Sequence, residues 1–126
     1  TAAAVADIDG DGRLELLVAH GESAAAPLSL YRGPDNGYGW LRVRPLTQYG
    51  APARGAVATL TANGRAQVRV VCGGSGYLCQ MEPVAHFGLG PDPRLRELTV
   101  TWPDGASVTI RDPEPRTTLV LAYPEG

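Results

Sequence analysis

Residues 56–70 read Ala-Val-Ala-Thr-Leu-Thr-Ala-Asn-Gly-Arg-Ala-Gln-Val-Arg-Val, and this stretch decides the fold class. Apolar and polar side chains alternate on both sides of Asn63-Gly64, as they do in strands with one buried face. An Asn-Gly pair between two such runs is typical of a two-residue hairpin turn, because both central residues of a type I′ turn need positive φ. The stretch therefore predicts an antiparallel β-hairpin.

The same pattern continues in both directions along the chain. Leu41 and Val43 alternate with arginines, residues 98–102 and 106–110 flank the turn sequence Pro-Asp-Gly, and residues 118–123 supply a last strand. Strands at intervals of about 8–12 residues with turn chemistry between them indicate two packed antiparallel sheets. We therefore predict an all-β chain whose main part is an antiparallel β-sandwich. No convincing helix is expected, and Gly88 and Gly90 are expected to reverse the chain around a buried Leu89.

The N-terminal part forms a separate group of short strands. Residues 5–7, 14–20 and 28–32 are expected to build one small sheet, and the composition changes in the glycine-rich segment 33–39. We therefore predict two modules, residues 1–37 and residues 38–126. Because the chain opens on Thr1 without a methionine or a signal-like segment, we expect it to be an excised or processed piece.

Composition excludes several classes of protein. The 126 residues include 16 glycines and 11 prolines spread along the whole length, which argues against a helical bundle. The charge is near balance, with 11 basic and 13 acidic side chains, and no basic stripe marks a nucleic-acid partner. No apolar run approaches the roughly 20 residues of a membrane-spanning helix, so membrane insertion is not expected.

The strongest chemical signal is the acidic loop Asp7-Ile-Asp9-Gly-Asp11-Gly-Arg13-Leu-Glu15. Its four carboxylates stand at positions 1, 3, 5 and 9, and the backbone carbonyl of Arg13 can supply position 7, a set of oxygens that suits Ca²⁺. An EF-hand would need a glutamate at position 12 and flanking helices, so the spacing favours a calcium loop between strands. A solvated acidic turn that binds nothing tightly is the alternative, and Mg²⁺ fits less well because it retains several waters.

No residue set predicts catalysis. Ser75 lies in a glycine-rich stretch, but Tyr77 occupies the place of the last glycine of a nucleophile elbow and no strand-to-helix turn is expected there. His20 and His86 stand at no metal-binding spacing, and a lone histidine is more often structural than a general base. We therefore predict no enzyme activity, no catalytic residue and no organic cofactor.

Two cysteines, Cys72 and Cys79, flank a glycine-rich turn. The spacing allows a short disulfide, which would indicate an oxidising compartment. Two half-buried thiols in a reduced protein are the other interpretation. Zinc is not expected, because no Cys-x-x-C pair or histidine cluster accompanies them.

The acidic loop followed by Leu-Leu-Val resembles the FG-GAP or VCBS calcium repeat of integrin-like β-propellers. Glu15 stands where that family usually has aspartate. The resemblance implies that residues 1 to about 32 are the last, incomplete piece of a propeller blade, with Ca²⁺ as its cofactor.

Four further motifs in order resemble the ASPIC/UnbV domain. They are Gly-Ala-Pro-Ala-Arg-Gly-Ala at 50–56, Gly-Gly-Ser-Gly-Tyr-Leu-Cys at 73–79, Glu-Pro-Val-Ala-His-Phe-Gly-Leu-Gly at 82–90, and Val-Thr-Trp-Pro-Asp-Gly at 100–105. The central block is most similar to the cartilage acidic protein family, secreted proteins in which a calcium-binding propeller precedes this domain. This resemblance implies a secreted, extracellular protein and thereby favours a Cys72–Cys79 disulfide.

Together these observations favour a non-enzymatic extracellular matrix or cell-surface recognition module. Its expected partner is an extracellular protein or a glycan, with a cell-surface receptor as one case. Tyr38 and Tyr77 are the candidate recognition residues, because large aromatic side chains are rare in this chain and are enriched in binding interfaces. The alternative is an accessory domain of an extracellular carbohydrate-active enzyme.

Overall fold

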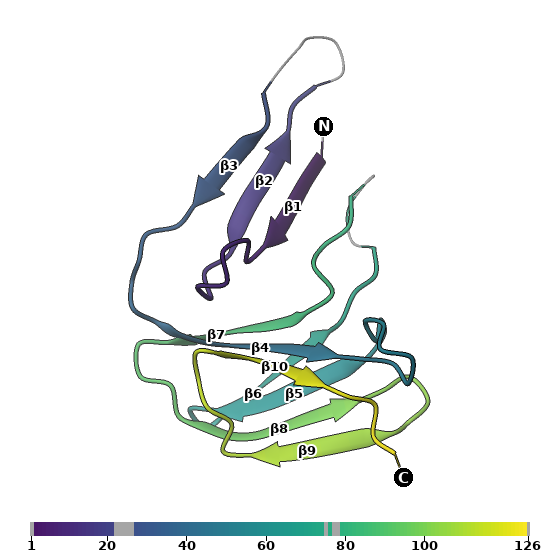
Figure 1. Ribbon diagram of the computed structural model, residues 1–126. Coiled ribbons are helices and arrows are strands. Elements are labelled where there is room, and N and C mark those ends of the chain that lie inside the picture. Colours follow the sequence, from purple (N-terminus) through teal and green to yellow (C-terminus); the bar gives the residue numbers. More distant parts are fainter. Residues whose placement is uncertain (1, 22–26, 75, 77–78, 126) are drawn as a thin grey trace.

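The computed structural model describes residues 2–21, 27–74, 76 and 79–125, which form ten β-strands and no helix (Figure 1). The strands are β1 (Ala2–Ala6), β2 (Glu15–Ala19), β3 (Ser29–Arg32), β4 (Gly39–Pro45), β5 (Val57–Ala62), β6 (Arg65–Val70), β7 (Ala85–Gly90), β8 (Leu95–Thr101), β9 (Ser107–Arg111) and β10 (Thr117–Leu121). The all-β prediction is confirmed. Within the described ranges, no helix has the length and hydropathy needed to span a membrane.

Two sheets form a β-sandwich, in which β10-β4-β7 lies over β6-β5-β8-β9 (Figure 1). The four-stranded sheet is antiparallel throughout, and so is the pairing of β4 with β7. β10 instead runs parallel to β4, because the chain crosses from β9 and enters beside the start of β4, where the Arg116 amide donates to the Trp40 carbonyl (2.6 Å). The predicted sandwich is confirmed, with this one parallel pair added.

The hydrophobic core lies between the two sheets. Its members alternate along the strands with outward-facing residues, as a half-buried strand requires. Phe87 of β7, the one phenylalanine in the sequence, is the largest fully buried side chain. The core strands contribute Leu41 and Val43 from β4, Ala58, Leu60 and Ala62 from β5, Ala85, Phe87 and Leu89 from β7, and Leu98 and Val100 from β8.

Both predicted hairpins are present. Asn63 and Gly64 have φ values of 52° and 74°, the positive pair that a type I′ turn needs, and Ala62 pairs with Arg65 across the turn. Around the second turn the Trp102 indole is buried and its Nε1 donates to the Leu46 carbonyl (2.9 Å). The indole thus anchors the end of the β8–β9 hairpin in the core.

The segment 85–90 differs from its prediction. Leu89 is buried as expected, but Gly88 and Gly90 do not reverse the chain around it, because the whole segment is strand β7, paired with β4. Ala85, Phe87 and Leu89 face the core, so His86, Gly88 and Gly90 face outward. The two outward glycines, interpreted as turn residues, are strand residues, so His86 is the outward-facing position of β7 that carries a side chain.

The strands β1, β2 and β3 form an antiparallel sheet that stands over the outer face of β4 and β7 (Figure 1). The end of β1 and the acidic loop that follows it both form hydrogen bonds with the connection between β6 and β7. In that connection the Met81 sulfur accepts a hydrogen bond from the Val5 amide (3.2 Å), and Glu82 Oε2 accepts one from the Asp7 amide (3.2 Å). The acidic loop is thereby held against the sandwich.

Candidate metal centre and adjoining cavity

Three of the four predicted carboxylates converge in the acidic loop. Asp7, Asp9 and Glu15 each offer an oxygen, and these oxygens lie within 4.8 Å of one another. Ca²⁺ binds oxygen at about 2.3–2.6 Å, so two oxygens on opposite sides of one ion lie about 4.6–5.2 Å apart. The three side chains therefore fit one calcium ion.

Backbone amides donate to all three of these carboxylates, and Asp9 Oδ1 accepts from the Asp11 amide (3.2 Å). Asp7 Oδ1 accepts hydrogen bonds from the amides of Gly10 (2.8 Å) and Asp11 (3.1 Å), and Oδ2 accepts one from Gly12 (2.9 Å). Glu15 Oε2 accepts one from the Ile8 amide (2.8 Å). The tight turn depends on Gly12, which has a φ of 85° and packs so closely on the Trp40 indole that a Cβ there would lie 2.0 Å from the ring.

Asp11, the fourth predicted carboxylate, binds the side chain and the amide of Arg13, whose predicted ligand is its backbone carbonyl. The Arg13 side chain forms an ion pair with Asp11 Oδ2, and the Arg13 amide donates to Oδ1 (2.9 Å). These hydrogen bonds lower the pKa of the Asp11 carboxyl. Asp11 therefore stays outside the converging set while it binds Arg13.

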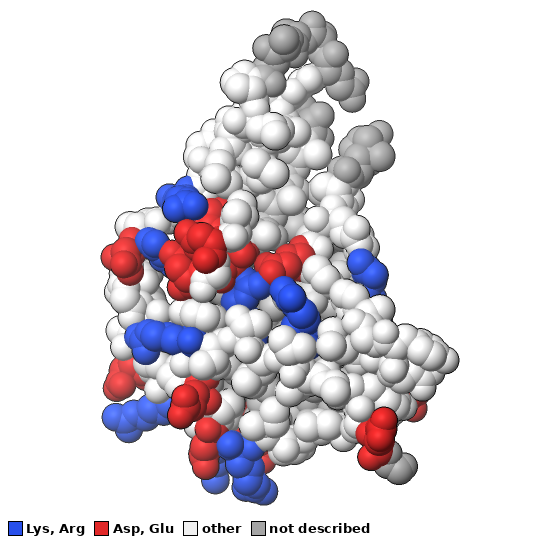
Figure 2. Space-filling view, viewed as in Figure 1, with Lys and Arg blue, Asp and Glu red and all other residues white. Residues whose placement is uncertain are grey.

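Arg42 of β4 connects the loop to the sandwich. The Arg42 residue is 4% exposed, and its Nη1 lies 3.1 Å from Asp7 Oδ2, an ion pair without the alignment of a hydrogen bond. Its Nη2 donates to Glu82 Oε1, to which the half-exposed Arg44 also lies close (3.5 Å). Figure 2 shows acidic and basic side chains gathered at this junction, whereas the β1–β3 sheet above it is nearly free of charge on the same face. The arginines predicted to alternate with core residues thus include one that is buried and paired.

His86 lies on the outer face of β7, close to this charge cluster. Burial lowers the pKa of the imidazole, and the positive charge of Arg42 lowers it further, against smaller opposing effects of Asp7 and Glu82. Its Nδ1 is buried and accepts or donates no hydrogen bond among the described residues. The ring is therefore held neutral at pH 7.

We expect this neutral histidine to make the protein less stable in mild acid. The unfolded chain takes up a proton near the ordinary pKa of about 6.5, whereas folded His86 resists it, so stability is complete above that pH and falls below it. Arg42 and Arg69 oppose protonation, and Asp7 and Glu82 favour it. Urea unfolding at about pH 7.5 and about pH 5.5 should show a larger acid loss for the native chain than for His86→Gln. Identical losses in both proteins would contradict this assignment.

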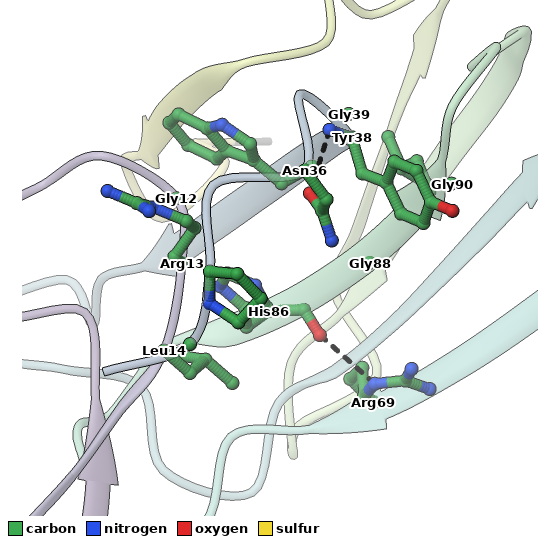
Figure 3. A pocket seen from close by; sticks show the side chains of 14 residues that line it. Gly12, Arg13, Leu14, Asn36, Tyr38, Gly39, Arg69, His86, Gly88 and Gly90 are labelled. Carbon is green, nitrogen blue, oxygen red and sulfur yellow. Dashed lines mark hydrogen bonds between the residues drawn. The ribbon is translucent and has the colours of Figure 1, made fainter. Parts of the chain in front are cut away.

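An open cavity of about 500 Å³ lies beside the loop, between the two parts of the chain (Figure 3). Its walls come from the loop, the linker and Trp40, and its floor is the outer face of β7 with Arg69 of β6 at one end. Tyr38 lines the cavity and is 49% exposed, so this predicted recognition residue is accessible.

The remaining predicted residues lie apart or outside the described ranges. Tyr77 and Ser75 are not among the described residues. Cys72 is exposed and Cys79 is partly buried, and their disulfide stays a prediction. His20 binds Ser29 (Nε2–Oγ 2.6 Å) on the β1–β3 sheet. Sequence reasoning missed Arg42, Glu82 and Arg69, because an arginine or glutamate at an outward strand position or in a loop looks like an ordinary surface residue.

This chain is similar to one protein family and to several individual proteins of known sequence. The ASPIC and UnbV family profile matches residues 47–126. Cartilage acidic protein 1 of Xenopus tropicalis is 52% identical over 128 residues, which cover 98% of this chain and 20% of the relative. The proteins of the same name from Mus musculus and Homo sapiens are each 50% identical over 99% and 98% of the chain. The chain spans about a fifth of the length of these relatives.

Proposed function

Because the chain belongs to the ASPIC and UnbV family, we propose that it is a calcium-stabilised, non-enzymatic recognition module of a secreted protein. The convergence of Asp7, Asp9 and Glu15 carries this proposal. In it, the cation orders the loop that joins the N-terminal sheet to the sandwich, and the sandwich presents a binding surface to an extracellular partner.

The burial of Glu15 supports a cation in this loop. The residue is 2% exposed, and no ion pair of Glu15 is present in the described part of the chain. A buried carboxylate without a neighbouring positive charge is unfavourable, and a bound cation removes that cost. Asp7 and Asp9 already have arginine partners, so Glu15 is the carboxylate whose surroundings change most when the ion binds.

The N-terminal sheet supports the proposal that residues 1–37 are part of a propeller blade. Leu17 and Leu30 pair across one face, Leu16 and Tyr31 pair across the other, and all four are exposed. An antiparallel sheet with one solvated face normally carries polar residues there, whereas blades of a propeller are covered on both faces by their neighbours. Relatives about five times as long have room for such neighbours.

The relatives named cartilage acidic protein 1 support the extracellular location, and a calcium site is compatible with it. Calcium sites of extracellular modules bind with dissociation constants of about 10⁻⁴–10⁻³ M, which suits a small set of carboxylates in an exposed loop. The proposed partner is a protein or a glycan of the matrix or the cell surface. An oxidising compartment would also permit the Cys72–Cys79 disulfide.

Terbium luminescence tests the metal site directly. Trp40 packs on Gly12 of the loop, so excitation of its indole should sensitise Tb³⁺ bound to the three carboxylates, and Ca²⁺ should displace the probe. We expect Asp9→Asn to weaken Tb³⁺ and Ca²⁺ binding at least about tenfold, which is about 1.4 kcal/mol of binding free energy. Asp9 is exposed, so this change should leave the fold intact.

Asp92→Asn is the matched control, because Asp92 is an exposed aspartate that lies outside the loop. Its binding curve should match that of the native chain. An additional loss in Asp11→Asn would make Asp11 a fourth ligand. Unchanged binding in Asp9→Asn, or no calorimetric binding of Ca²⁺ to the native chain, would overturn the metal assignment.

A further inference from the structure

We propose that the cavity between the acidic loop and the outer face of β7 binds a carboxylated sugar ring, such as a uronic acid or a sialic acid. This inference deepens the proposed recognition function and rests on it. Four features of the cavity carry the argument: its glycine floor, its exposed aromatic wall, its free amide and one arginine with unused donors. None of them is a ligand of the candidate metal centre.

Gly88 makes the floor of the cavity open. A Cβ built on this residue meets no atom within 4 Å, and its φ is not in the positive range that requires glycine. Glycine in the middle of a strand weakens the strand, and it often marks a place where a ligand approaches the backbone closely. Neither backbone conformation nor packing therefore explains the missing side chain, whereas a flat ligand lying on the strand does.

The wall above this floor suits a sugar ring. Tyr38 is half-exposed and Trp40 is partly buried, so both aromatic side chains reach the cavity. Aromatic rings offer an apolar face against which the C–H groups of a pyranose can pack, while polar groups nearby bind the hydroxyls. The Asn36 side chain accepts the Tyr38 amide through Oδ1 (2.9 Å), which fixes the side chain and leaves its NH₂ group as a donor (Figure 3).

Arg69 gives the cavity its charge. Its Nε donates to the His86 carbonyl (3.1 Å), Nη1 donates to the Val68 carbonyl (2.9 Å), and Nη2 donates to Gln67 Oε1 (3.1 Å). The guanidinium also lies 5.3 Å from the centroid of the Phe87 ring. Three of the five N–H donors of an arginine are thus used, and one on each terminal nitrogen remains.

The charge that Arg69 contributes is not cancelled nearby. Arg13, the other arginine at the cavity, is paired with Asp11, whereas no acidic side chain forms an ion pair with Arg69 among the residues described. A carboxylate accepts two parallel hydrogen bonds from a guanidinium, and a donor that is already fixed in place loses little freedom on binding. One fixed arginine beside an aromatic wall therefore favours a ring that carries a carboxylate over a neutral sugar.

The test uses calorimetric titration of the 126-residue chain with four probes. A glucuronic acid disaccharide and sialyllactose represent the two sources of a carboxylated ring, lactose is the neutral sugar, and an acetylated peptide ending in glutamate represents a protein partner. We expect one of the acidic sugars to bind with a Kd of about 1 mM or tighter, and lactose and the peptide to bind at least about tenfold more weakly.

Two variants locate the site. Gly88→Leu fills the floor and should abolish binding, while Gly74→Leu, at an exposed glycine that also has open space and lies outside the cavity, should not. Arg69→Gln should weaken the acidic sugar at least about tenfold, while Arg65→Gln on the same strand should leave it unchanged. Circular dichroism melts establish that each variant is folded.

The outcomes separate this inference from the proposed function. Binding of neither acidic sugar, equal binding of lactose, or binding unaffected by Gly88→Leu would overturn the inference while leaving the terbium result intact. Preference for the acidic peptide would overturn the ligand class and assign the cavity to a protein partner. If the native chain binds an acidic sugar but no Ca²⁺, the calcium assignment alone would be overturned.

Discussion

Replacing Phe87 with alanine is expected to lower the free energy of unfolding by about 3–5 kcal/mol. The ring is 0% exposed and is the largest fully buried side chain of the described chain. It stands at the middle of β7, where it faces the core and also carries the Arg69 guanidinium on its ring. Truncation removes this apolar contact and leaves a cavity between sheets that β4 and β5 cannot close without moving.

Urea unfolding followed by circular dichroism measures the loss. Val68→Ala is the control, because Val68 is an exposed apolar residue on neighbouring β6, and its loss should stay within about 1 kcal/mol. If the free energy of unfolding of Phe87→Ala depends on urea concentration with the same slope as that of the native chain, the folded and unfolded states have kept their compactness. A loss of less than about 1 kcal/mol for Phe87→Ala would contradict the central place of this ring in the core.

Local sequence predicts some parts of this fold and not others, and β7, the strand that carries Phe87, belongs to the second group. The hairpins at Asn63-Gly64 and Asp104-Gly105 were predictable, because turn chemistry and alternation act over a few residues. β7 was not, since its outward positions hold glycines that were interpreted as a turn and interrupted the apparent alternation. β10 lies beside β4, about 75 residues away in the sequence, and no local pattern specifies that parallel partner.

The candidate site also has a part that local sequence predicts and a part that depends on tertiary structure. The spacing of Asp7, Asp9 and Glu15 predicted a set of converging oxygens, because a short loop with glycines brings its own side chains together. The partners from elsewhere could not be predicted, since Arg42 and Glu82 are separated from Asp7 by 35 and 75 residues. Arg69 and Gly88 form the cavity only after β6 and β7 are placed, so the ligand class also depends on tertiary structure.

Arg42→Met is expected to cost about 3–5 kcal/mol of unfolding free energy. The methionine keeps most of the length of the side chain but removes the charge that faces Asp7 and Glu82. The Asp7 side chain is 0% exposed, so its carboxylate would remain buried without a cation. Removing one partner of a buried ion pair is strongly destabilising for this reason, whereas an exposed ion pair contributes about 0–1 kcal/mol to the free energy of unfolding.

Arg44→Met is the matched control for this experiment. Arg44 also lies near Glu82, but 41% of its side chain is exposed and its distance to Glu82 Oε1 is 3.5 Å, so its loss should cost no more than about 1 kcal/mol. In the proposed site, Arg42 and Ca²⁺ both place positive charge beside the Asp7 carboxylate, and like charges at such distances repel. Ca²⁺ should therefore bind Arg42→Met more tightly than the native chain and restore part of its stability. Equal losses in the two arginine variants would show that the Arg42–Asp7 pair does not join the loop to the sandwich. A calcium affinity that Arg42→Met leaves unchanged would place the ion away from Asp7.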